Sequence, residues 1–176
     1  MSDGAHLVLV GLMGAGKTTV GTECAARLGR PFVDTDDLVV ARVGMPFIDF
    51  WTNHGEAAFR EIEREVVADV CASPDPLVVA CGGGTVVDPD SRRRLRAAGI
   101  VVWLRAPVRV LASRVGSQPD HARPLLAGDP VVALGRLEAA REAAYEGSAH
   151  VAVDTSDRDV DEVASAVLEA YERERP

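Results

Sequence analysis

A glycine-rich segment near the N-terminus carries the residues whose types and spacing most directly suggest chemistry. Residues 11–19 read Gly-Leu-Met-Gly-Ala-Gly-Lys-Thr-Thr and match the Gly-x4-Gly-Lys-Thr pattern of a phosphate-binding loop. Glycines let successive backbone N–H groups turn inward around an anion, and the start of a following helix adds the positive end of its dipole. Lys17 would reach the outer phosphates of a nucleotide, and Thr18 would offer its hydroxyl to Mg²⁺. A glycine-rich turn without a ligand explains the complete pattern poorly, so we expect nucleotide binding.

Lysine occurs once in the chain, although 19 residues are lysine or arginine. A sequence that otherwise uses arginine keeps Lys17 where a compact point charge serves better than a planar guanidinium. Guanine-specific switch proteins recognise their base with an Asn-Lys-x-Asp segment, and a chain without a second lysine contains none. We therefore expect ATP rather than GTP.

Two aspartates, Asp34 and Asp36, follow a short apolar run at residues 30–33. In an extended chain residues two apart face the same side, so both carboxylates would point into a cleft at the end of this predicted strand. One would hold the metal and its water or take a proton, and the other would hold the hydroxyls of an acceptor. Asp36 or Asp37 could instead cap the helix that follows, which is a structural role.

Three consecutive glycines, Gly82, Gly83 and Gly84, follow another predicted strand at residues 77–80. Ligands bind at the carboxyl ends of the strands in open α/β sheets, and glycine lets a ligand approach the backbone closely. A flexible turn without a ligand would use the same residues. The run is therefore a candidate binding loop.

Arginines on two predicted helices are candidates for holding an anionic ligand. Arg141 falls in the middle of the apolar stripe of its helix, and an unpaired guanidinium is costly to bury. Its partner should be either a carboxylate of the protein or the carboxylate or phosphate of a ligand. Arg60 lies at the edge of a similar stripe and faces sideways toward a cleft. For Arg60 alone, an ion pair with Glu56 one turn earlier is the simpler explanation.

Short valine-rich runs alternate with amphipathic stretches along the chain, a pattern typical of βαβ units and a parallel sheet. The predicted strands cover residues 6–10, 30–33, 77–80, 100–104 and 151–153. The predicted helices cover residues 17–28, 37–42, 56–71, 91–98, 107–115, 131–145 and 160–173. Together they predict an α/β fold with three layers, α/β/α, around a central five-stranded parallel sheet.

Residues 116–130 form the longest stretch without a clear element and are rich in glycine, proline and charge. Such a segment is either a connection or a functional lid. Arg123 lies within it, and a mobile lid would bring this arginine onto a transferring phosphoryl group while excluding water.

The composition of the 176-residue chain, with 47% apolar and 26% charged residues, is typical of a single globular domain. Its net charge of −8 argues against a nucleic-acid-binding face. No apolar run approaches the ~20 residues of a membrane span, and the N-terminus lacks a secretory signal. Three widely spaced cysteines predict a reduced, cytoplasmic protein, and the histidines lack metal-ligand spacing.

In their order along the chain, these motifs resemble those of the shikimate kinases, small P-loop phosphotransferases with the nucleoside monophosphate kinase fold. The resemblance covers about residues 6–168. The matching motifs are the phosphate loop, Asp34-Thr35-Asp36, Phe59-Arg60 followed by Glu63, the three glycines, Arg123-Pro124-Leu125-Leu126, Arg141 with Tyr145, and Val153-Asp154-Thr155. The resemblance implies ATP-dependent phosphorylation of shikimate to shikimate 3-phosphate, on the pathway to chorismate and the aromatic amino acids.

The resemblance also implies a role for each candidate residue. The catalytic residues would be Lys17, Asp34 and Arg123, and Mg²⁺ would be held directly or through water by Thr18 and Asp34. Shikimate would contact Asp36, Arg60, Gly82, Gly83, Gly84 and Arg141. ATP would contact Gly14, Ala15, Gly16, Lys17, Thr18, Thr19, Arg114, Arg123 and Arg158.

We expect a monomeric enzyme formed by one kinase domain over residues 1–176, with a lid at about 116–130 and a helical acceptor-binding region at about 37–70. Residues 45–51, Met-Pro-Phe-Ile-Asp-Phe-Trp, depart from the family's usual run and predict a bulkier wall for the acceptor pocket. Two other functions stay open: a kinase of another small polyol or cyclitol, and a catalytically silent nucleotide-binding module.

Overall fold

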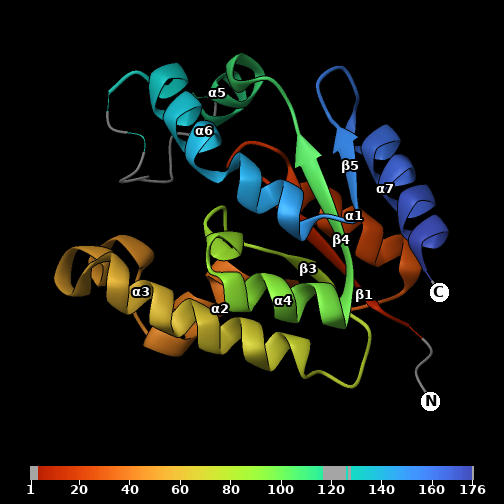
Figure 1. Cartoon of the computed structure of the whole chain (residues 1–176), viewed down its shortest axis with the longest axis horizontal. Helices are drawn as coiled ribbons and strands as arrows, with labels where there is room; N and C mark the ends of the chain where they lie inside the picture. Colours follow the sequence, from red (N-terminus) through yellow and green to blue (C-terminus); the bar gives the residue numbers. More distant parts are fainter. Residues whose placement is uncertain (1–3, 117–125, 127, 176) are drawn as a thin grey trace.

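The computed structural model describes residues 4–116, 126 and 128–175 and contains a five-stranded sheet between two layers of helices (Figure 1). The strands are β1 (His6–Val10), β2 (Phe32–Asp34), β3 (Val78–Ala80), β4 (Gly99–Arg105) and β5 (Val151–Asp154). They lie in the order β2-β3-β1-β4-β5, and every neighbouring pair is parallel. The predicted α/β fold with five parallel strands is confirmed.

The central strands are buried on both faces, which explains why they read as continuous apolar runs in the sequence. Every residue of β1 and β3 is buried. The polar exception is His6, whose Nδ1 accepts the N–H of Leu77 at 3.1 Å. His150, just before β5, accepts the N–H of Val101 in the same way at 3.0 Å. Burial lowers the pKa of both histidines, which favours the neutral imidazoles that complete the hydrogen bonding of the sheet.

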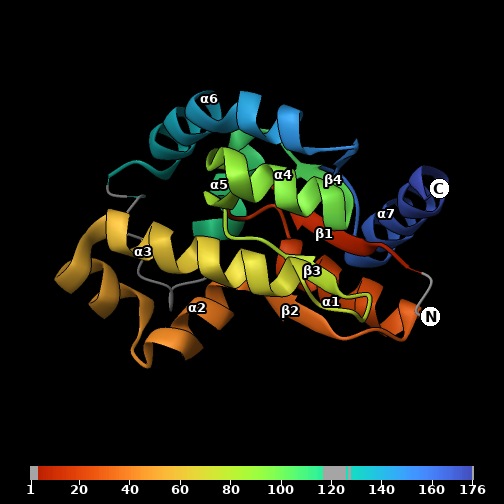
Figure 2. The same cartoon turned by 60° about the horizontal axis from the view of Figure 1, so that its bottom comes forward.

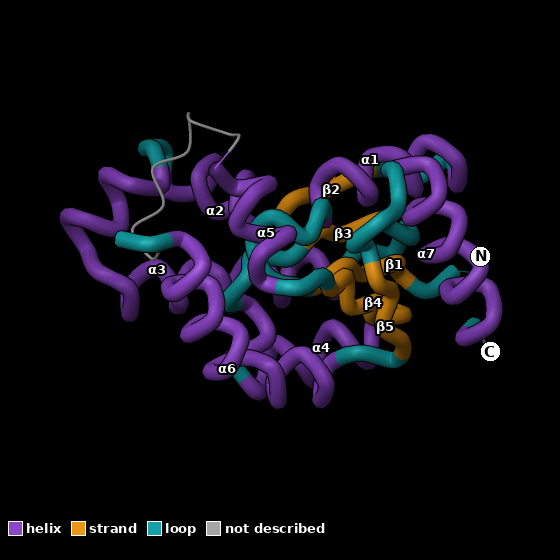
Figure 3. Tube along the Cα trace, turned by 90° about the horizontal axis from the view of Figure 1, so that it is seen from above, coloured by secondary structure: helices purple, strands orange, loops and turns teal. Residues whose placement is uncertain are grey.

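The helices cover the two faces of the sheet in separate layers. On one face lie α1 (Lys17–Leu28) and α7 (Val160–Glu174), and on the other lie α4 (Pro89–Ala98) and α6 (Pro130–Ser148) (Figure 3). Beside α6 lies α5 (Val108–Gly116), and the 3₁₀ helix η1 (Thr85–Val87) precedes α4. At one end of the molecule α2 (Thr35–Val43) packs with α3 (Phe47–Cys71) (Figure 2). None of the described helices is long and apolar enough to cross a membrane.

The helical region between β2 and β3 differs from its prediction. The helix α2 begins at Thr35, two residues early, because the Asp34 carboxylate caps it by accepting the N–H of Asp36 at 3.0 Å. The predicted helix 56–71 is only the second half of α3, which begins at Phe47 and is interrupted at Gly55 (φ 81°, ψ 174°). The first half is rich in aromatic residues with weak helix propensity, which explains why it was missed.

The strand order places a crevice above the carboxyl ends of β1 and β3. The chain leaves β1 toward α1 on one face of the sheet and leaves β3 toward α4 on the other (Figure 3). Neighbouring parallel strands whose connections diverge in this way leave a gap, which is the usual ligand site of open α/β sheets. The phosphate loop follows β1 and the glycine run follows β3, so both flank this crevice.

Candidate active site

A cleft of about 1100 Å³ opens at this crevice and brings together the candidate residues that the structure describes. Its lining includes Gly14, Ala15, Gly16, Lys17, Thr18, Thr19, Asp34, Asp36, Arg60, Gly82, Gly83, Gly84, Arg114, Arg141 and Arg158. Arg123 lies outside the described residues, as do residues 117–125 and 127 of the proposed lid. The two halves of the predicted site therefore share one cleft.

The phosphate loop is shaped by its backbone. Gly11 has a φ of 146°, and a Cβ there would collide with the carbonyl oxygen of Leu104 on the neighbouring strand, so only glycine fits. Gly16 is the N-cap of α1, and the first turn of this helix lines the cleft. The start of a helix directs backbone N–H groups and the positive end of its dipole toward a bound anion. The Nζ of Lys17 donates to the carbonyl oxygens of Gly11 at 2.8 Å and Leu12 at 3.0 Å. The loop thus places backbone donors beside a cation.

Thr18 and Asp34 lie together beside this loop. The Oγ1 of Thr18 donates to Oδ2 of Asp34 at 2.8 Å, while Oδ1 of Asp34 caps α2. The prediction that Asp34 and Asp36 face the same side because both lie on an extended strand was wrong. The strand β2 ends at Asp34, and Asp36 belongs to the first turn of α2. Both carboxylates still line the cleft, and the cap is Asp34 rather than Asp36 or Asp37. A hydroxyl and a carboxylate are oxygen donors of the kind that Mg²⁺ prefers.

The carboxylate of Asp36 lies against the glycine run. A Cβ on Gly82 would lie 2.5 Å from Oδ1 of Asp36 and 3.0 Å from Oε1 of Glu63, so a larger residue there would displace them. The residue Asp36 is exposed to solvent in the open cleft, although many protein atoms surround its carboxylate. Burial, followed by the negative charges of Asp34 and Glu63, raises the pKa of Asp36 to about 6, and nearby cations offset this only in part.

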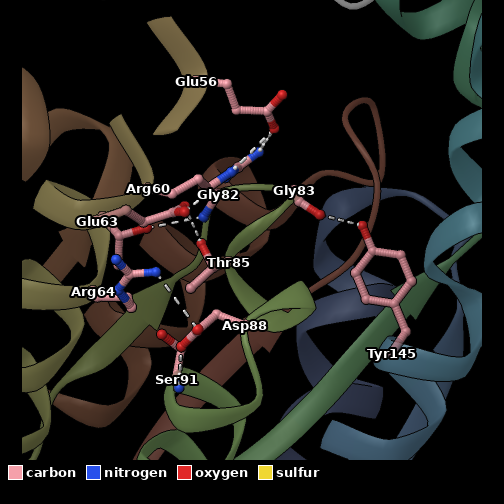
Figure 4. Close-up of polar contacts among 11 residues, drawn as sticks. Glu56, Arg60, Glu63, Arg64, Gly82, Gly83, Thr85, Asp88, Ser91 and Tyr145 are labelled. Atoms are coloured by element: carbon pink, nitrogen blue, oxygen red, sulfur yellow. Dashed lines mark hydrogen bonds and ion pairs between the residues drawn. The ribbon is translucent and has the colours of Figure 1, made fainter. Parts of the chain in front are cut away.

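Arg60 on α3 is held by two carboxylates of its own helix (Figure 4). The expected pair with Glu56 exists at 3.3 Å, but Glu63 is the closer partner, at 2.6 Å. Glu63 is buried, and the Oγ1 of Thr85 donates to its other oxygen at 2.6 Å. A Cβ on Gly84 would overlap the guanidinium of Arg60. The glycine run therefore gives this arginine the room to reach the cleft.

Arg141 on α6 is buried in the apolar stripe that the sequence predicts, with 6% of its surface exposed. It forms no ion pair with any carboxylate in the part of the chain that the structure describes. Its Nη1 lies 3.4 Å from the position of a Cβ on Gly83, and the residue lines the cleft. Of the two partners predicted for this guanidinium, a ligand is the one that the described residues favour.

Arg114 and Arg158 lie on the phosphate-loop side of the cleft. The guanidinium of Arg114 donates to the carbonyl oxygen and to Oγ1 of Thr155, at 2.6 and 2.9 Å, and to the carbonyl oxygen of Gly14 at 3.3 Å. It thereby ties the phosphate loop to the segment after β5, where Arg158 also lines the cleft. Thr155, to which sequence reasoning gave no role, is the buried anchor of this link.

Sequence reasoning also gave no role to Glu63, Thr85 or the individual aromatic residues of the wall. The wall contains a cluster of three aromatic rings, those of Phe47, Trp51 and Phe59. Their centroids lie between 5.1 and 5.5 Å from one another. All three line the cleft, and Phe47 and Trp51 belong to residues 45–51, for which a bulkier wall of the acceptor pocket stays a prediction. Glu63 belongs to a motif quoted above, and its pairing with Arg60 could have been predicted because residues three apart are neighbours on a helix. Thr85 carries no local signal, because its partner lies on another element.

Comparison with known proteins decides the family. The family model described as Shikimate kinase matches residues 13–172. The chain belongs to the shikimate kinase family. A shikimate kinase of Symbiobacterium thermophilum is 47% identical over 165 residues, which cover 93% of this chain and 94% of that protein. The solved structure of a shikimate kinase from Acinetobacter baumannii in complex with shikimate is 34% identical, with a TM-score of 0.90, and the match covers 96% of this chain and 93% of that chain. The shikimate kinase fold thus includes the elements that form the cleft.

Proposed function

We propose that this member of the shikimate kinase family transfers the γ-phosphoryl group of ATP to a ring hydroxyl of shikimate. The product is shikimate 3-phosphate, on the pathway to chorismate and the aromatic amino acids. The observation that carries the proposal is Arg141, a buried guanidinium that lines the cleft and pairs with no carboxylate of the described chain. Burying a guanidinium costs free energy unless an anion pairs with it, and the carboxylate of an acceptor supplies that anion. Family membership supports the same acceptor.

The phosphate end of the cleft binds ATP. Backbone N–H groups of residues 14–19 hold the phosphates, and Lys17 stabilises the charge that moves as the γ-phosphoryl group is transferred. Arg114 and Arg158 lie toward the adenine. Arg123 closes over the transferring group from a lid at about 116–130, where it excludes water and adds a second cation.

Mg²⁺ fits between Thr18 and Asp34. The two side chains lie within 2.8 Å of each other at the edge of the phosphate loop, and both offer oxygen. Mg²⁺ keeps several waters and takes ligands from phosphates, so two protein oxygens suffice, directly or through water. When bound, the ion neutralises charge on the phosphates.

The acceptor end binds shikimate through arginines from two helices. Arg60 and Arg141 converge on the carboxylate, while the backbone of Gly82, Gly83 and Gly84 lies against the acceptor. Asp36 holds the reacting hydroxyl and accepts its proton. A base with a pKa of about 6 suits this task, because it is ionised at neutral pH yet still binds a proton.

An assay of ADP release with shikimate, quinate and gluconate as rival acceptors tests the proposal. Shikimate should give the highest kcat/KM, above the hydrolysis measured without acceptor, and turnover should require Mg²⁺. Preference for gluconate would identify a kinase of another polyol. Release of no ADP with any acceptor would leave a silent nucleotide-binding module.

We further propose a monomeric, cytoplasmic enzyme with one kinase domain and with no nucleic-acid or membrane partner. The net charge of −8 supports the lack of a nucleic-acid partner, and the free thiols of Cys24, Cys71 and Cys81 support a reducing, cytoplasmic location. Light scattering coupled to chromatography should return the mass of one chain, 18.7 kDa. Twice that mass would replace the monomer with a dimer.

A further inference from the structure

Tyr145 is a buried residue beside the cleft to which the proposed reaction assigns no role. It lies on α6 one turn after Arg141, with 1% of its surface exposed, and its ring stacks on Trp103 with centroids 5.5 Å apart. Its hydroxyl donates to the carbonyl oxygen of Gly83 at 2.6 Å (Figure 4). Burial raises the pKa of Tyr145 to about 12, so the hydroxyl keeps its proton and remains a donor at neutral pH.

This hydrogen bond sets the direction of one peptide group in the glycine run. The described chain contains no cis peptide bond, and in a trans peptide the C=O of one residue points opposite to the N–H of the next. Because the Gly83 carbonyl is turned toward α6, the Gly84 N–H is turned away from it. Neither the Gly83 nor the Gly84 N–H donates to an acceptor within the described chain, and both residues line the cleft. The run therefore offers donors to a ligand.

Glycine cannot maintain such an arrangement alone, because it has more backbone freedom than any other residue. Two anchors compensate for this freedom. The Gly82 N–H donates to Oγ1 of Thr35 at 2.9 Å, and the Gly83 carbonyl accepts from Tyr145. The anchor on Gly83 is the one that orients the peptide facing the ligand.

The same hydroxyl adjoins the guanidinium of Arg141. The positive charge of Arg141 near the hydroxyl partly offsets the effect of burial on the pKa of Tyr145. Since the hydroxyl proton is directed at Gly83, the oxygen lone pairs can accept from Arg141. Tyr145 thus contacts both the backbone and the cation that the proposed function places on the acceptor carboxylate.

We propose that Tyr145 is a positioning residue of the acceptor site. Its hydroxyl holds the Gly83 peptide and the Arg141 guanidinium in the arrangement that receives the carboxylate of the acceptor. The inference rests on the proposed function for the statement that these two groups meet that carboxylate. Tyr145 acts through its neighbours rather than on the reacting atoms.

Tyr171, the other tyrosine of the chain, is a matched control. It is fully buried on α7, its hydroxyl donates to the carbonyl oxygen of Ala5 at 2.6 Å, and it accepts from Nη1 of Arg30 at 2.6 Å. Like Tyr145, it links an arginine to a backbone carbonyl. It does so before the start of β1, whereas the cleft lies after the end of that strand. Removal of either hydroxyl should therefore destabilise the fold to a similar extent.

Tyr145→Phe and Tyr171→Phe each remove one hydroxyl and keep the ring. In Tyr145→Phe we expect KM for shikimate to rise roughly five- to tenfold and KM for ATP to stay within about twofold of the wild type. Tyr171→Phe should leave both constants unchanged. The methyl ester of shikimate, which lacks the charged carboxylate, should inhibit wild type and Tyr145→Phe with the same Ki. An unchanged KM for shikimate in Tyr145→Phe, or an equal loss for the ester, would overturn the proposal.

A ¹⁹F-labelling experiment tests the role of Tyr145 without removing its hydroxyl. Because the chain has two tyrosines, Tyr171→Phe grown with 3-fluorotyrosine carries one ¹⁹F label, at position 145. Saturation with shikimate should shift this resonance, and saturation with ADP alone should not; an unmoved resonance with shikimate would contradict the role of Tyr145. Turnover of shikimate by the wild type is measured first, so that failure of the proposed function is seen separately.

Discussion

The phosphate end of the cleft is built around one continuous stretch of chain, the phosphate loop and the first turn of α1, to which Asp34, Arg114 and Arg158 add side chains. The acceptor end is assembled from α2, α3, the glycine run and α6. At the phosphate end the backbone forms most of the binding surface, through the glycine conformations of the loop and the first turn of α1. At the acceptor end side chains form most of the binding surface, and neighbouring residues position them. Arg60 is positioned by Glu63, which in turn accepts a hydrogen bond from Thr85, and Arg141 lies beside Tyr145. The acceptor end can therefore be altered without disturbing the nucleotide end.

Lys17 should show the largest effect of any single substitution. Lys17→Ala should lower kcat roughly 1000-fold or more, because cations on the transferring phosphoryl group contribute that much to phosphoryl transfer. Lys17→Arg should also lose most of the activity, since a planar fork does not replace a point charge in a tight loop. Melting temperatures should stay near the wild-type value. Near-normal turnover by Lys17→Arg would remove Lys17 from this role.

Asp36 lies between the two ends and should show the next largest effect. Asp36→Asn should lower kcat roughly 100-fold, because the reacting hydroxyl loses its base. In the wild type the base must be ionised, so kcat/KM for shikimate, which reports ionisation of the free enzyme, should fall as the pH drops through about 6, the pKa of Asp36. A pH profile for both proteins checks this, and a wild-type profile that is flat from pH 5 to pH 7 would contradict it.

The same substitution should have the opposite effect on stability. The raised pKa means that the folded protein disfavours the ionised carboxylate of Asp36. The free energy of unfolding of the wild type should therefore decrease as the pH rises from the unfolded-state pKa of 3.8 through the folded-state pKa of about 6. Asp36→Asn should thus be more stable than the wild type at pH 8, by on the order of 1 kcal/mol given the solvent contact of the residue. This difference in stability between Asp36→Asn and the wild type should disappear below pH 3.8, the pKa of Asp36 in the unfolded chain. Thermal melts across this range measure it, and a lower melting temperature for Asp36→Asn at pH 8 would exclude this account.

The contrast between the two ends also explains what the sequence could predict. The phosphate loop was located residue by residue because its function rests on a contiguous motif, and α1 was bounded correctly because Gly29 ends it. The capping role of Asp34 was missed, because strand periodicity was extended two residues past the true end of β2. A boundary of this kind depends on tertiary packing as well as on local pattern.

The acceptor end was predicted in part. Helical periodicity placed Arg141 in an apolar stripe, but only the folded chain shows which carboxylates come near it. Thr85 bonds to a residue 22 positions away and Tyr145 to one 62 positions away, so no local pattern in the sequence relates them. Such long-range pairs are set by the packing of α3 and α6 around the glycine run.

Arg141→Leu should affect the acceptor end alone. Affinity for shikimate should fall by roughly 2 to 3 kcal/mol, about 30- to 150-fold, as expected when one side of a buried charge pair is removed. Affinity for ATP should hardly change. Stability without ligand should be unchanged or slightly higher, because no carboxylate of the described chain loses its partner. Melts with and without shikimate measure both effects. A destabilised variant that still gains the normal shift from shikimate would give Arg141 a structural role instead.

Gly84→Ala should give the smallest effect and the finest test of the separation between the two ends. Gly84 has φ −102° and ψ −5°, which alanine adopts without strain, so the added Cβ acts through its overlap with the guanidinium of Arg60. That guanidinium is the far end of a flexible side chain and can shift, but the shift strains its pair with buried Glu63, so a small loss of stability should accompany the change. We therefore expect KM for shikimate to rise roughly three- to tenfold, with KM for ATP unchanged.

Gly135→Ala on α6 is the matched control, because a Cβ there meets no atom within 4 Å and should leave both KM values unchanged. If Gly84→Ala raised KM for ATP as much as KM for shikimate, the glycine run would belong to both ends of the cleft. The acceptor site would then depend on the nucleotide site through the backbone between β3 and η1, and substitutions on the acceptor side would no longer leave nucleotide binding intact.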